Sequence, residues 1–285
     1  MRFINYSDFY QDVKQIGLEA AAKRSQRLGF GGVEFLDLAP LRENSPLNKT
    51  CAAETKKILD AYGQSVACFS VAVNLLDPMA DGYVDTLWRQ IEFAAELGSD
   101  KFHHTIGLTW DRERALSTPY QTALDIAFPR ARLVAERCAS YGMTCLYEPQ
   151  GYYFNGTDGL GRFYAQMKQE FPNIGICGDV GNCLFAETPA TAIYDAFASD
   201  IRHVHIKDYL VFGTQQNLSS ERISRGGKYL YHCPVGEGVT DFSYCFQKLK
   251  EVGYDGDVAF EFEGDDDEIR RVMAFVSDLW KENLK

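Results

Sequence analysis

The amino-acid sequence predicts one domain, residues 1–285, folded as a single (β/α)₈ barrel. Eight short β-rich runs alternate with helical patterns almost from end to end of the chain. Several helical patterns end in glycine and are followed by a short turn and a strand, as in LGFGGVEF and YGMTCLYE. The length of 285 residues is near the roughly 250 that such barrels use as one unit. An open doubly wound sheet is the alternative, but MRFINYSDFY lacks the glycine-rich phosphate loop that usually follows its first strand.

The predicted strands are rich in Val, Ile, Phe and Tyr, and Gly or Asp turns often precede them. They are Arg2–Asn5, Gly32–Asp37, Ser65–Val73, Lys101–Ile106, Thr144–Pro149, Ile174–Val180, His203–Asp208 and Val258–Glu263. Eight strands with helices between them favour a closed parallel barrel.

The predicted helices carry apolar residues near every third or fourth position, and most stop at a glycine or before a proline. They are Phe9–Leu28, Asp85–Leu97, Pro119–Tyr141, Phe163–Phe171, Pro189–Ala198, Phe242–Val252 and Asp266–Lys285. One connection is unusually long, because roughly thirty residues separate His203–Asp208 from the helix at Phe242. It follows a strand, so we expect a lid or binding loop on the catalytic face of the barrel.

Composition and charge exclude several classes of function. The formal net charge is −11, which is unfavourable for gripping a phosphate backbone, so nucleic acid is not an expected partner. The eight cysteines form no C-x-x-C pair and several lie in apolar runs, which indicates buried, reduced thiols. The N-terminus has no apolar signal-peptide core, and no apolar run approaches the roughly 20 residues that span a bilayer. We therefore expect a soluble, cytoplasmic protein without a membrane partner.

Polar residues end the last four predicted strands, one on each. In a (β/α)₈ barrel the carboxyl ends of the strands build the active site, so these side chains should converge. A carboxylate in an apolar strand is costly unless it is paired or bound to a metal. Each residue alone has an ordinary explanation as a loop carboxylate, a helix cap, a core histidine or a solvated strand end. Together, three carboxylates and one imidazole predict a site for Mn²⁺, Mg²⁺ or Co²⁺. The four residues are Glu148, Asp179, His205 and Glu261.

Other polar residues near the barrel mouth are weaker candidates. His103 and His104 point to opposite sides of their strand, and we expect His104 to face the mouth as an additional base or substrate ligand. His203 shares the inward face of its strand with His205, one layer deeper, and is expected in the core. Lys207 lies on that face nearer the top and is a candidate for a substrate oxygen, although a solvated lysine is the alternative.

Three further sets are predicted to contact substrate. Glu34 ends the second strand and is expected to contact substrate or a metal-binding residue. His232 lies in the long connection with basic residues that would meet an anionic group, unless the loop is simply solvated. Aromatic residues after strand ends would stack on a sugar or pack in the core. The basic residues are Arg222, Arg225 and Lys228, and the aromatic ones are Trp110, Tyr152, Tyr153 and Phe154.

Segments LYEPQG, GICGDVGN, RHVHIKDY, CPVGEG and AFEFEG resemble the xylose isomerase-like TIM barrels, also called the sugar phosphate isomerase/epimerase family. The resemblance covers nearly the whole chain, since GFGGVEFLD near the N-terminus is also typical. It implies that Glu148, Asp179, His205 and Glu261 bind one divalent ion, Mn²⁺ first, with Mg²⁺, Co²⁺ or Zn²⁺ as alternatives. It further implies a sugar or polyol substrate, a metal-bound enediolate, and Glu148 and Glu261 as the acid/base pair of an isomerase or epimerase.

One departure from the family pattern affects the choice of reaction. The family often has D-x-G-H where this chain has Asp179-Val180-Gly181-Asn182, so Asn182 becomes a candidate substrate contact. That asparagine, with the acidic charge, disfavours the three-metal cluster of the AP endonucleases. The rival on the same scaffold is a lyase, similar to inosose dehydratase or to a C-deglycosidase catalytic subunit that acts on 3-oxo-glycosides. A barrel that serves mainly as a partner subunit is the remaining alternative. A homo-oligomer or a second subunit stays open.

Overall fold

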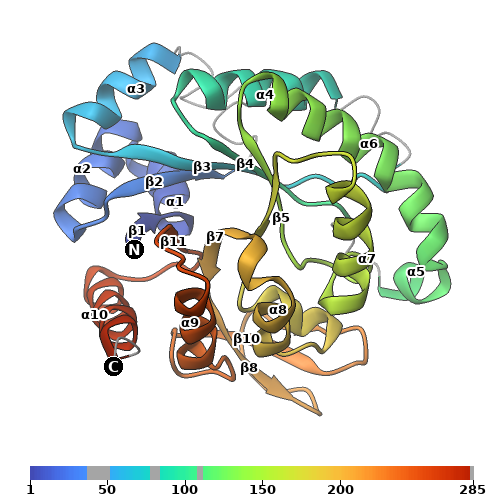
Figure 1. Ribbon diagram of the computed structural model, residues 1–285. Helices are drawn as coiled ribbons and strands as arrows, with labels where there is room; N and C mark the ends of the chain where they lie inside the picture. The colour runs from blue at the N-terminus through green and yellow to red at the C-terminus, as the bar shows by residue number, and fades with distance from the viewer. Residues whose placement is uncertain (37–51, 78–83, 108–111, 283–285) are drawn as a thin grey trace.

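The computed structural model describes residues 1–36, 52–77, 84–107 and 112–282. The predicted fold is confirmed: eight parallel strands close into a barrel in the order β1-β11-β7-β6-β5-β4-β3-β2, and helices cover its outside (Figure 1). The barrel strands are β1 (Arg2–Asn5), β2 (Gly32–Leu36), β3 (Ser65–Val71), β4 (Lys101–His104), β5 (Thr144–Tyr147), β6 (Ile174–Cys177), β7 (Ile201–Ile206) and β11 (Asp257–Phe260).

All eight barrel strands overlap the predicted ones, but most end earlier. The strand predicted to end at Pro149 stops at Tyr147, and the one predicted to end at Val180 stops at Cys177. Strand pairing ends at these residues, and the polar residues that follow belong to the loops at the barrel mouth. Parts of the prediction fall outside the described residues, namely Asp37, Trp110 and the last three residues of the chain.

The helices around the barrel differ from the prediction mainly at the N-terminus. The single helix predicted over Phe9–Leu28 is two helices, because Gly17 between them has φ 84°, a conformation that other residues rarely adopt. Two helices were not predicted, α3 and α5. The helices are α1 (Ser7–Ile16), α2 (Leu18–Leu28), α3 (Ala52–Ala61), α4 (Val84–Glu96), α5 (Arg112–Ser117), α6 (Tyr120–Ser140), α7 (Gly156–Lys168), α8 (Ala190–Phe197), α9 (Phe242–Glu251) and α10 (Asp266–Glu282).

The core has an aromatic layer outside the strands and a small-residue layer inside the barrel. Outside, Phe69 stacks between Phe35 and Phe102, with ring centroids 5.9 and 6.0 Å away. Inside, Cys68, Leu146 and Cys177 pack together. The cysteines among the described residues form no disulfide, as predicted, and all are buried except the partly buried Cys233. Cys51 lies outside the described residues. No helix in the described part of the chain is both long and apolar enough to cross a membrane.

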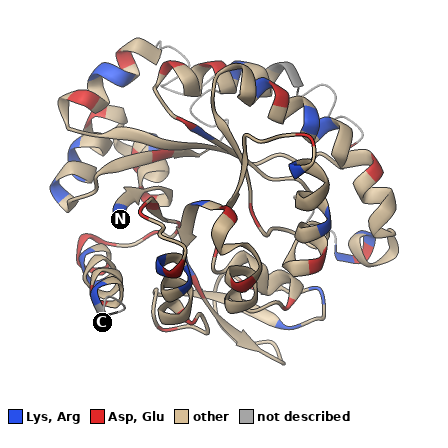
Figure 2. Ribbon diagram, in the orientation of Figure 1, with Lys and Arg blue, Asp and Glu red and all other residues tan. Residues whose placement is uncertain are grey.

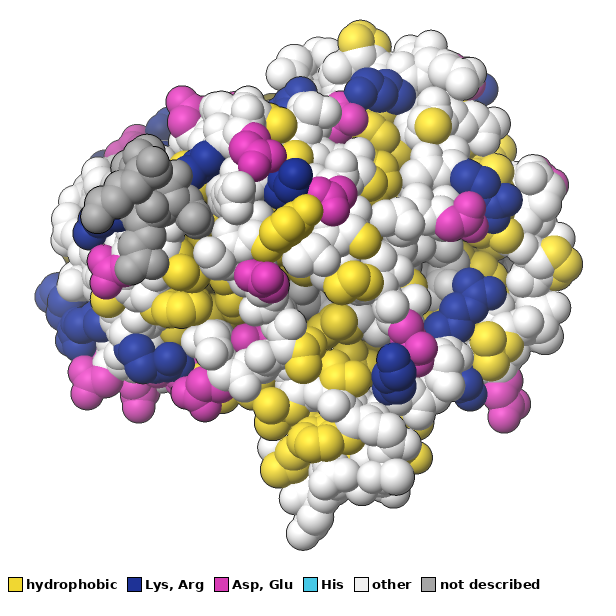
Figure 3. All heavy atoms as spheres, turned by 60° about the horizontal axis from the view of Figure 1, so that its bottom comes forward, with side chains coloured by type: hydrophobic (Ala, Val, Ile, Leu, Met, Phe, Trp, Pro, Cys, Tyr) yellow, Lys and Arg dark blue, Asp and Glu magenta, His cyan; other side chains and the backbone are white. Residues whose placement is uncertain are grey.

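The long connection after β7 folds into a small antiparallel sheet rather than an open loop. Its strands are β8 (Asp208–Phe212), β9 (Arg222–Ile223) and β10 (Tyr229–Cys233), in the order β8-β10-β9. This sheet lies at the lower edge of the molecule in Figure 1. Figure 3 shows the molecule after its lower side is turned forward, with a projecting lobe of hydrophobic and uncharged side chains at the bottom of that view. Leu218 and Ile223 in this segment are exposed. The connection therefore adds a structured wall beside the barrel mouth.

Asp208 ties the two ends of this connection together. Its carboxylate accepts hydrogen bonds from the backbone N–H groups of Gly236, Gly238 and Thr240, at 3.1, 2.9 and 3.2 Å. A Cβ atom at Gly238 would overlap the Asp208 carboxylate, which explains the second glycine of the G-E-G sequence.

We expect Asp208→Ala to lower the free energy of unfolding by about 2–3 kcal/mol, because it leaves backbone N–H groups without an ionised acceptor. Urea denaturation followed by circular dichroism measures this change. Asp255→Ala, at an exposed carboxylate, is the matched control and should change the free energy by less than about 0.5 kcal/mol. Equal effects of the two substitutions would contradict the role of Asp208.

Candidate metal centre

The four residues predicted as metal ligands lie together at the carboxyl ends of neighbouring strands. Glu148 and Glu261 directly follow β5 and β11, Asp179 comes two residues after β6, and His205 lies in β7. Backbone bonding continues past the strand ends: the N–H of Glu261 donates to the carbonyl of Ile206 at 3.0 Å. One ligand atom from each of the four residues lies within 4.8 Å of the others. The residues predicted from strand position and from family resemblance therefore form one spatial cluster.

His205 is the centre of this group. Its Nδ1 lies 3.1 Å from Glu261 Oε2, 3.5 Å from Glu148 Oε2 and 3.9 Å from Asp179 Oδ2. Glu148, Asp179 and His205 are buried, whereas the side chain of Glu261 is 22% exposed. Neither His205 Nδ1 nor Glu261 Oε2 has a hydrogen-bond partner among the described residues. Buried polar atoms are normally satisfied, so unpaired atoms that face one point fit a bound ion. Three carboxylates and an imidazole suit a hard or borderline divalent ion.

The charges of the group reinforce this fit. Lys207 Nζ lies 3.0 Å from Asp179 Oδ2 and 2.7 Å from Glu261 Oε1. Burial raises the pKa of Asp179 to about 8, despite Lys207, and the neighbouring Glu261 and Glu148 add to the rise. Burial also acts to raise the pKa of Glu261, but Lys207 and His205 outweigh it and lower this pKa to about 2. The crowded carboxylates are thus only partly neutralised by the lysine, and a dication would supply the missing positive charge.

Asn182 holds two of the carboxylates of the group. Its backbone N–H and that of Gly181 donate to Asp179 Oδ1 at 2.6 and 2.8 Å, which turns Asp179 Oδ2 toward His205. Its side-chain Nδ2 lies 3.4 Å from Glu148 Oε2. Gly181 is required here, because a Cβ atom would lie 2.6 Å from Cγ of Lys207. Asn182 is therefore within reach of the group, beside one of its predicted ligands.

The structure corrects the prediction that His104 faces the barrel mouth. His104 points outward, its Nδ1 lies 2.9 Å from the carbonyl oxygen of Thr105, and its ring packs edge-on against Tyr147. His103 instead points inward, with Nε2 3.3 Å from Glu148 Oε1. Sequence reasoning had the alternation right but chose the wrong member of the pair.

Substituting this pair separates the two roles. We expect His103→Asn to lower the turnover number by about 10–100-fold, because it removes a neighbour that orients Glu148. His104→Asn should leave turnover within about threefold while lowering the free energy of unfolding by about 1–3 kcal/mol, because a buried hydrogen bond is lost. Steady-state rates together with urea denaturation measure both effects. A larger loss of turnover in His104→Asn than in His103→Asn would contradict this assignment.

Glu34 takes the second of its two predicted places. It was predicted to contact substrate or a metal-binding residue, and it is fully buried below the group, where its carboxylate meets His203, His205 and Ser70. A substrate at the barrel mouth cannot reach it without displacing His205. His203 lies deeper than His205, as expected. Glu34 therefore supports the candidate ligands instead of contacting substrate.

A cavity of about 560 Å³ opens beside Glu261. His232 lines it from β10, with its Nε2 3.2 Å from the Tyr209 hydroxyl and its ring 4.3 Å from that of Tyr209. Burial and the nearby Lys207 lower the pKa of His232 to about 4, so this imidazole is neutral at pH 7. The lining residues are Ser7, Ser220, His232, Cys233, Pro234, Glu261, Phe262, Glu263 and Glu268.

Several contacts near this cavity were not predicted. Ser7 lines it, and the ring of Tyr6 lies 4.8 Å from that of His205. Both residues directly follow β1, so the strand-end rule that found the four ligands would have found them as well. Neither is a charged residue or a histidine, the residue types on which the predicted ligand set rests.

The basic and aromatic candidates of the loops are engaged elsewhere. Arg225 donates to the carbonyl of Tyr152, and Lys228 pairs with Glu187 at 3.6 Å. Tyr153 donates to the carbonyl of Arg114. Figure 2 shows basic residues interleaved with acidic ones over the outer helices rather than gathered on one face. Of these described residues, Arg225, Lys228 and Tyr153 bond to other protein groups and do not line the cavity beside Glu261.

The fold and this group of side chains define a TIM barrel protein with an oxygen-rich candidate metal centre at the carboxyl ends of its strands. A family model described as the xylose isomerase-like TIM barrel matches residues 22–279, and the chain belongs to this family. The family resemblance predicted from the motifs is thereby confirmed.

Individual relatives are distant in sequence. A ketose 3-epimerase from Arthrobacter globiformis is 26% identical over 276 residues, which are 94% of this chain and 86% of that protein. A xylose isomerase-like TIM barrel protein from Mycobacterium smegmatis, solved in complex with magnesium, has a TM-score of 0.73 at 15% identity and covers 100% of this chain and 98% of its own. A 3-keto-D-glucoside 4-epimerase from E. coli has a TM-score of 0.71 at 18% identity, over 98% of this chain and 99% of its own.

Proposed function

We propose that this chain is a divalent-metal-dependent sugar isomerase or epimerase, with Glu148 and Glu261 as its acid/base pair. The observation that carries the proposal is the meeting of two glutamates, an aspartate and a histidine beside a cavity. The similarity to a ketose 3-epimerase supports a sugar as substrate. The magnesium complex of a protein with the same fold supports a divalent ion. Mn²⁺ is the ion that we propose first, with Mg²⁺, Co²⁺ or Zn²⁺ as alternatives.

The residues that would hold the ion are Glu148, Asp179, His205 and Glu261. A divalent cation there would stabilise the negative charge that develops on a substrate carbonyl oxygen when the neighbouring carbon loses its proton. Carbon acids next to a carbonyl are weak, so this charge stabilisation and a well-placed base are both needed.

The two glutamates are suited to move that proton. Glu261 is the one partly exposed member of the group and lines the cavity, and its lowered pKa keeps it ionised as a base. Burial acts to raise the pKa of Glu148, but His103 and His205 outweigh it and hold this pKa well below its usual range. The two residues follow β5 and β11, on either side of β6 and β7, so they approach the centre from different directions. A substrate carbon held between them would lose its proton to one carboxylate and take up, on its opposite face, a solvent-derived proton delivered through the other carboxylate.

Neighbouring side chains supply substrate contacts. Lys207 Nζ lies among the carboxylates and can donate to a substrate oxygen. Asn182 lies beside Glu148, and the neutral His232 can donate to or accept from a hydroxyl across the cavity. Glu261, Glu263 and Glu268 make the described lining acidic, which favours a neutral sugar or polyol.

Solvent-deuterium exchange tests this function. Protein loaded with Mn²⁺ is incubated in D₂O with a panel of neutral ketoses and 3-oxo-glycosides, and products are analysed by mass spectrometry and NMR. Deuterium next to the carbonyl, with an epimer or aldose–ketose isomer as product, is the expected result. Loss of water or of the glycosidic substituent would assign the chain to the rival lyases. Absence of exchange with every compound would contradict the proposal.

A further inference from the structure

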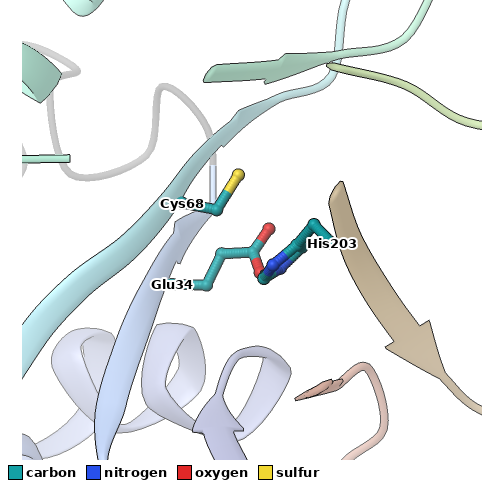
Figure 4. Close-up of side chains that lie close together, drawn as sticks. All are labelled: Glu34, Cys68 and His203. Atoms are coloured by element: carbon teal, nitrogen blue, oxygen red, sulfur yellow. The ribbon is translucent and has the colours of Figure 1, made fainter. Parts of the chain in front are cut away.

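One buried carboxylate organises the histidines beneath the candidate metal centre. Glu34 points from β2 into the barrel toward His203 on β7 (Figure 4). Its Oε2 lies 2.6 Å from Nε2 of His203, and its Oε1 lies 3.0 Å from Nε2 of His205. Glu34, His203 and His205 are all buried. Burying a carboxylate in a protein core costs free energy unless the group is paired and hydrogen-bonded. The contacts of Glu34 with two imidazoles therefore indicate a specific role for this residue.

The contact with His205 decides which of its nitrogens faces the ligand group. Because Nε2 lies 3.0 Å from a carboxylate oxygen, this nitrogen is placed to donate its proton to Glu34, and Nδ1 is then the nitrogen that would offer its lone pair to a bound ion. Nδ1 is the atom that lies 3.1 Å from Glu261 and 3.5 Å from Glu148. Imidazoles that bind metals usually donate their other N–H to a carboxylate in this manner, which fixes the ring and strengthens it as a ligand.

The influence of Glu34 extends to the other side of the centre. Ser70 donates its hydroxyl proton to Glu34 Oε1, and its oxygen lies 3.0 Å from Nδ1 of His103. The opposite nitrogen of His103 lies 3.3 Å from Glu148 Oε1. A continuous chain of contacts therefore runs from His205 through Glu34, Ser70 and His103 to Glu148.

The same region has a competing interpretation as a second cation site. Glu34, Cys68 and His203 offer ligand atoms within 4.8 Å of one another. Both Glu34 oxygens are, however, already bonded, one to His203 and the other to His205 and Ser70. The space is closed to solvent, and burial raises the pKa of the Cys68 thiol well above its usual range, whereas a metal requires the thiolate. The contacts favour a supporting role.

We propose that Glu34 is the positioning residue of the metal centre: it holds His205 with Nδ1 toward the three carboxylates and, through Ser70, holds His103 beside Glu148. The inference rests on the proposed metal-dependent function. It makes metal affinity depend on a residue that touches neither the ion nor the substrate.

Cobalt binding tests this role without any turnover. Full-length protein is stripped with a chelator and titrated with Co²⁺, followed by calorimetry and by the visible absorption of the bound ion. We expect one Co²⁺ per wild-type chain. Glu34→Gln keeps the size of the side chain but cannot accept from both histidines, and should weaken Co²⁺ binding by about 10–100-fold and change the absorption bands. Cys68→Ala, in the same core, is the matched control and should bind Co²⁺ as wild type does.

Each outcome bears on the proposal. A folded Glu34→Gln protein with wild-type affinity and spectrum would overturn it. A second Co²⁺ in the wild type that is lost in Cys68→Ala would overturn it in favour of the second site. If Glu34→Gln does not fold, Ser70→Ala decides, because it removes only a hydroxyl: weaker binding than in Cys68→Ala supports the proposal, and identical binding overturns it. A wild-type chain that binds no Co²⁺ would instead contradict the proposed metal-dependent function itself.

Discussion

Replacing Glu261 by glutamine should lower the rate of solvent-deuterium exchange into substrate by about 10²–10⁴-fold, the usual contribution of a positioned general base. The glutamine keeps the size of the side chain but cannot take a proton from carbon. It also removes one of the carboxylates around His205 Nδ1, so binding of the cation should weaken as well. Measuring the exchange rate at saturating Mn²⁺ separates the loss of the base from the loss of the ion.

Glu263→Gln is the matched control for this substitution. Glu263 lies two residues further on and lines the same cavity, but it is exposed and belongs to none of the described candidate ligand groups. The exchange rate of this variant should stay within about threefold of wild type, as for most surface substitutions. If Glu261→Gln were as active as Glu263→Gln, Glu261 would not be the base.

Removal of the divalent ion should abolish activity and lower thermal stability together. After dialysis against a chelator we expect turnover to fall to background and to return with Mn²⁺. At an ion concentration of 100 times the Kd, binding adds about 2.7 kcal/mol to the stability of the folded state. For a chain of this size that corresponds to a rise in Tm of roughly 4–5 °C.

Differential scanning calorimetry with and without Mn²⁺ measures this gain. Asp179→Ala provides the control, because it removes a predicted ligand that is buried among the other three. Its Tm should not respond to Mn²⁺ over the range that saturates wild type. Full turnover of the chelated protein, or an equal rise in Tm for Asp179→Ala, would contradict a metal centre at these residues.

The barrel was predictable because each of its strands carries its own local signal. An apolar β-rich run such as Ile174–Cys177 is buried on both faces, and the sequence predicts the residue at which this strand begins. The break at Gly17 was missed because apolar periodicity continues across it, and only its positive φ reveals two helices. The small sheet over β8, β9 and β10 was missed because its strands pair locally within a segment whose composition is that of a loop.

The candidate ligands were predictable for the same topological reason, since parallel strands bring their carboxyl ends to one mouth. The support beneath them was predicted only as one of two alternatives for Glu34, and its partners were not predicted. Nothing in the sequence says that Glu34 reaches across the barrel to His203, because that contact joins residues 169 positions apart. The choice between His103 and His104 depended on which face of a short strand points inward, and a shift by one residue reverses that face. The prediction of a cytoplasmic location and that of an oligomer or second subunit stay predictions.

The most direct test of the account is the position of the ion itself. Crystals grown with Mn²⁺ and measured near the manganese absorption edge locate it by anomalous scattering. We predict one peak that lies roughly 2.0–2.6 Å from an oxygen of Glu148, Asp179 and Glu261 and from Nδ1 of His205. A peak at some other group of residues, or none at these four in the presence of saturating Mn²⁺, would contradict it.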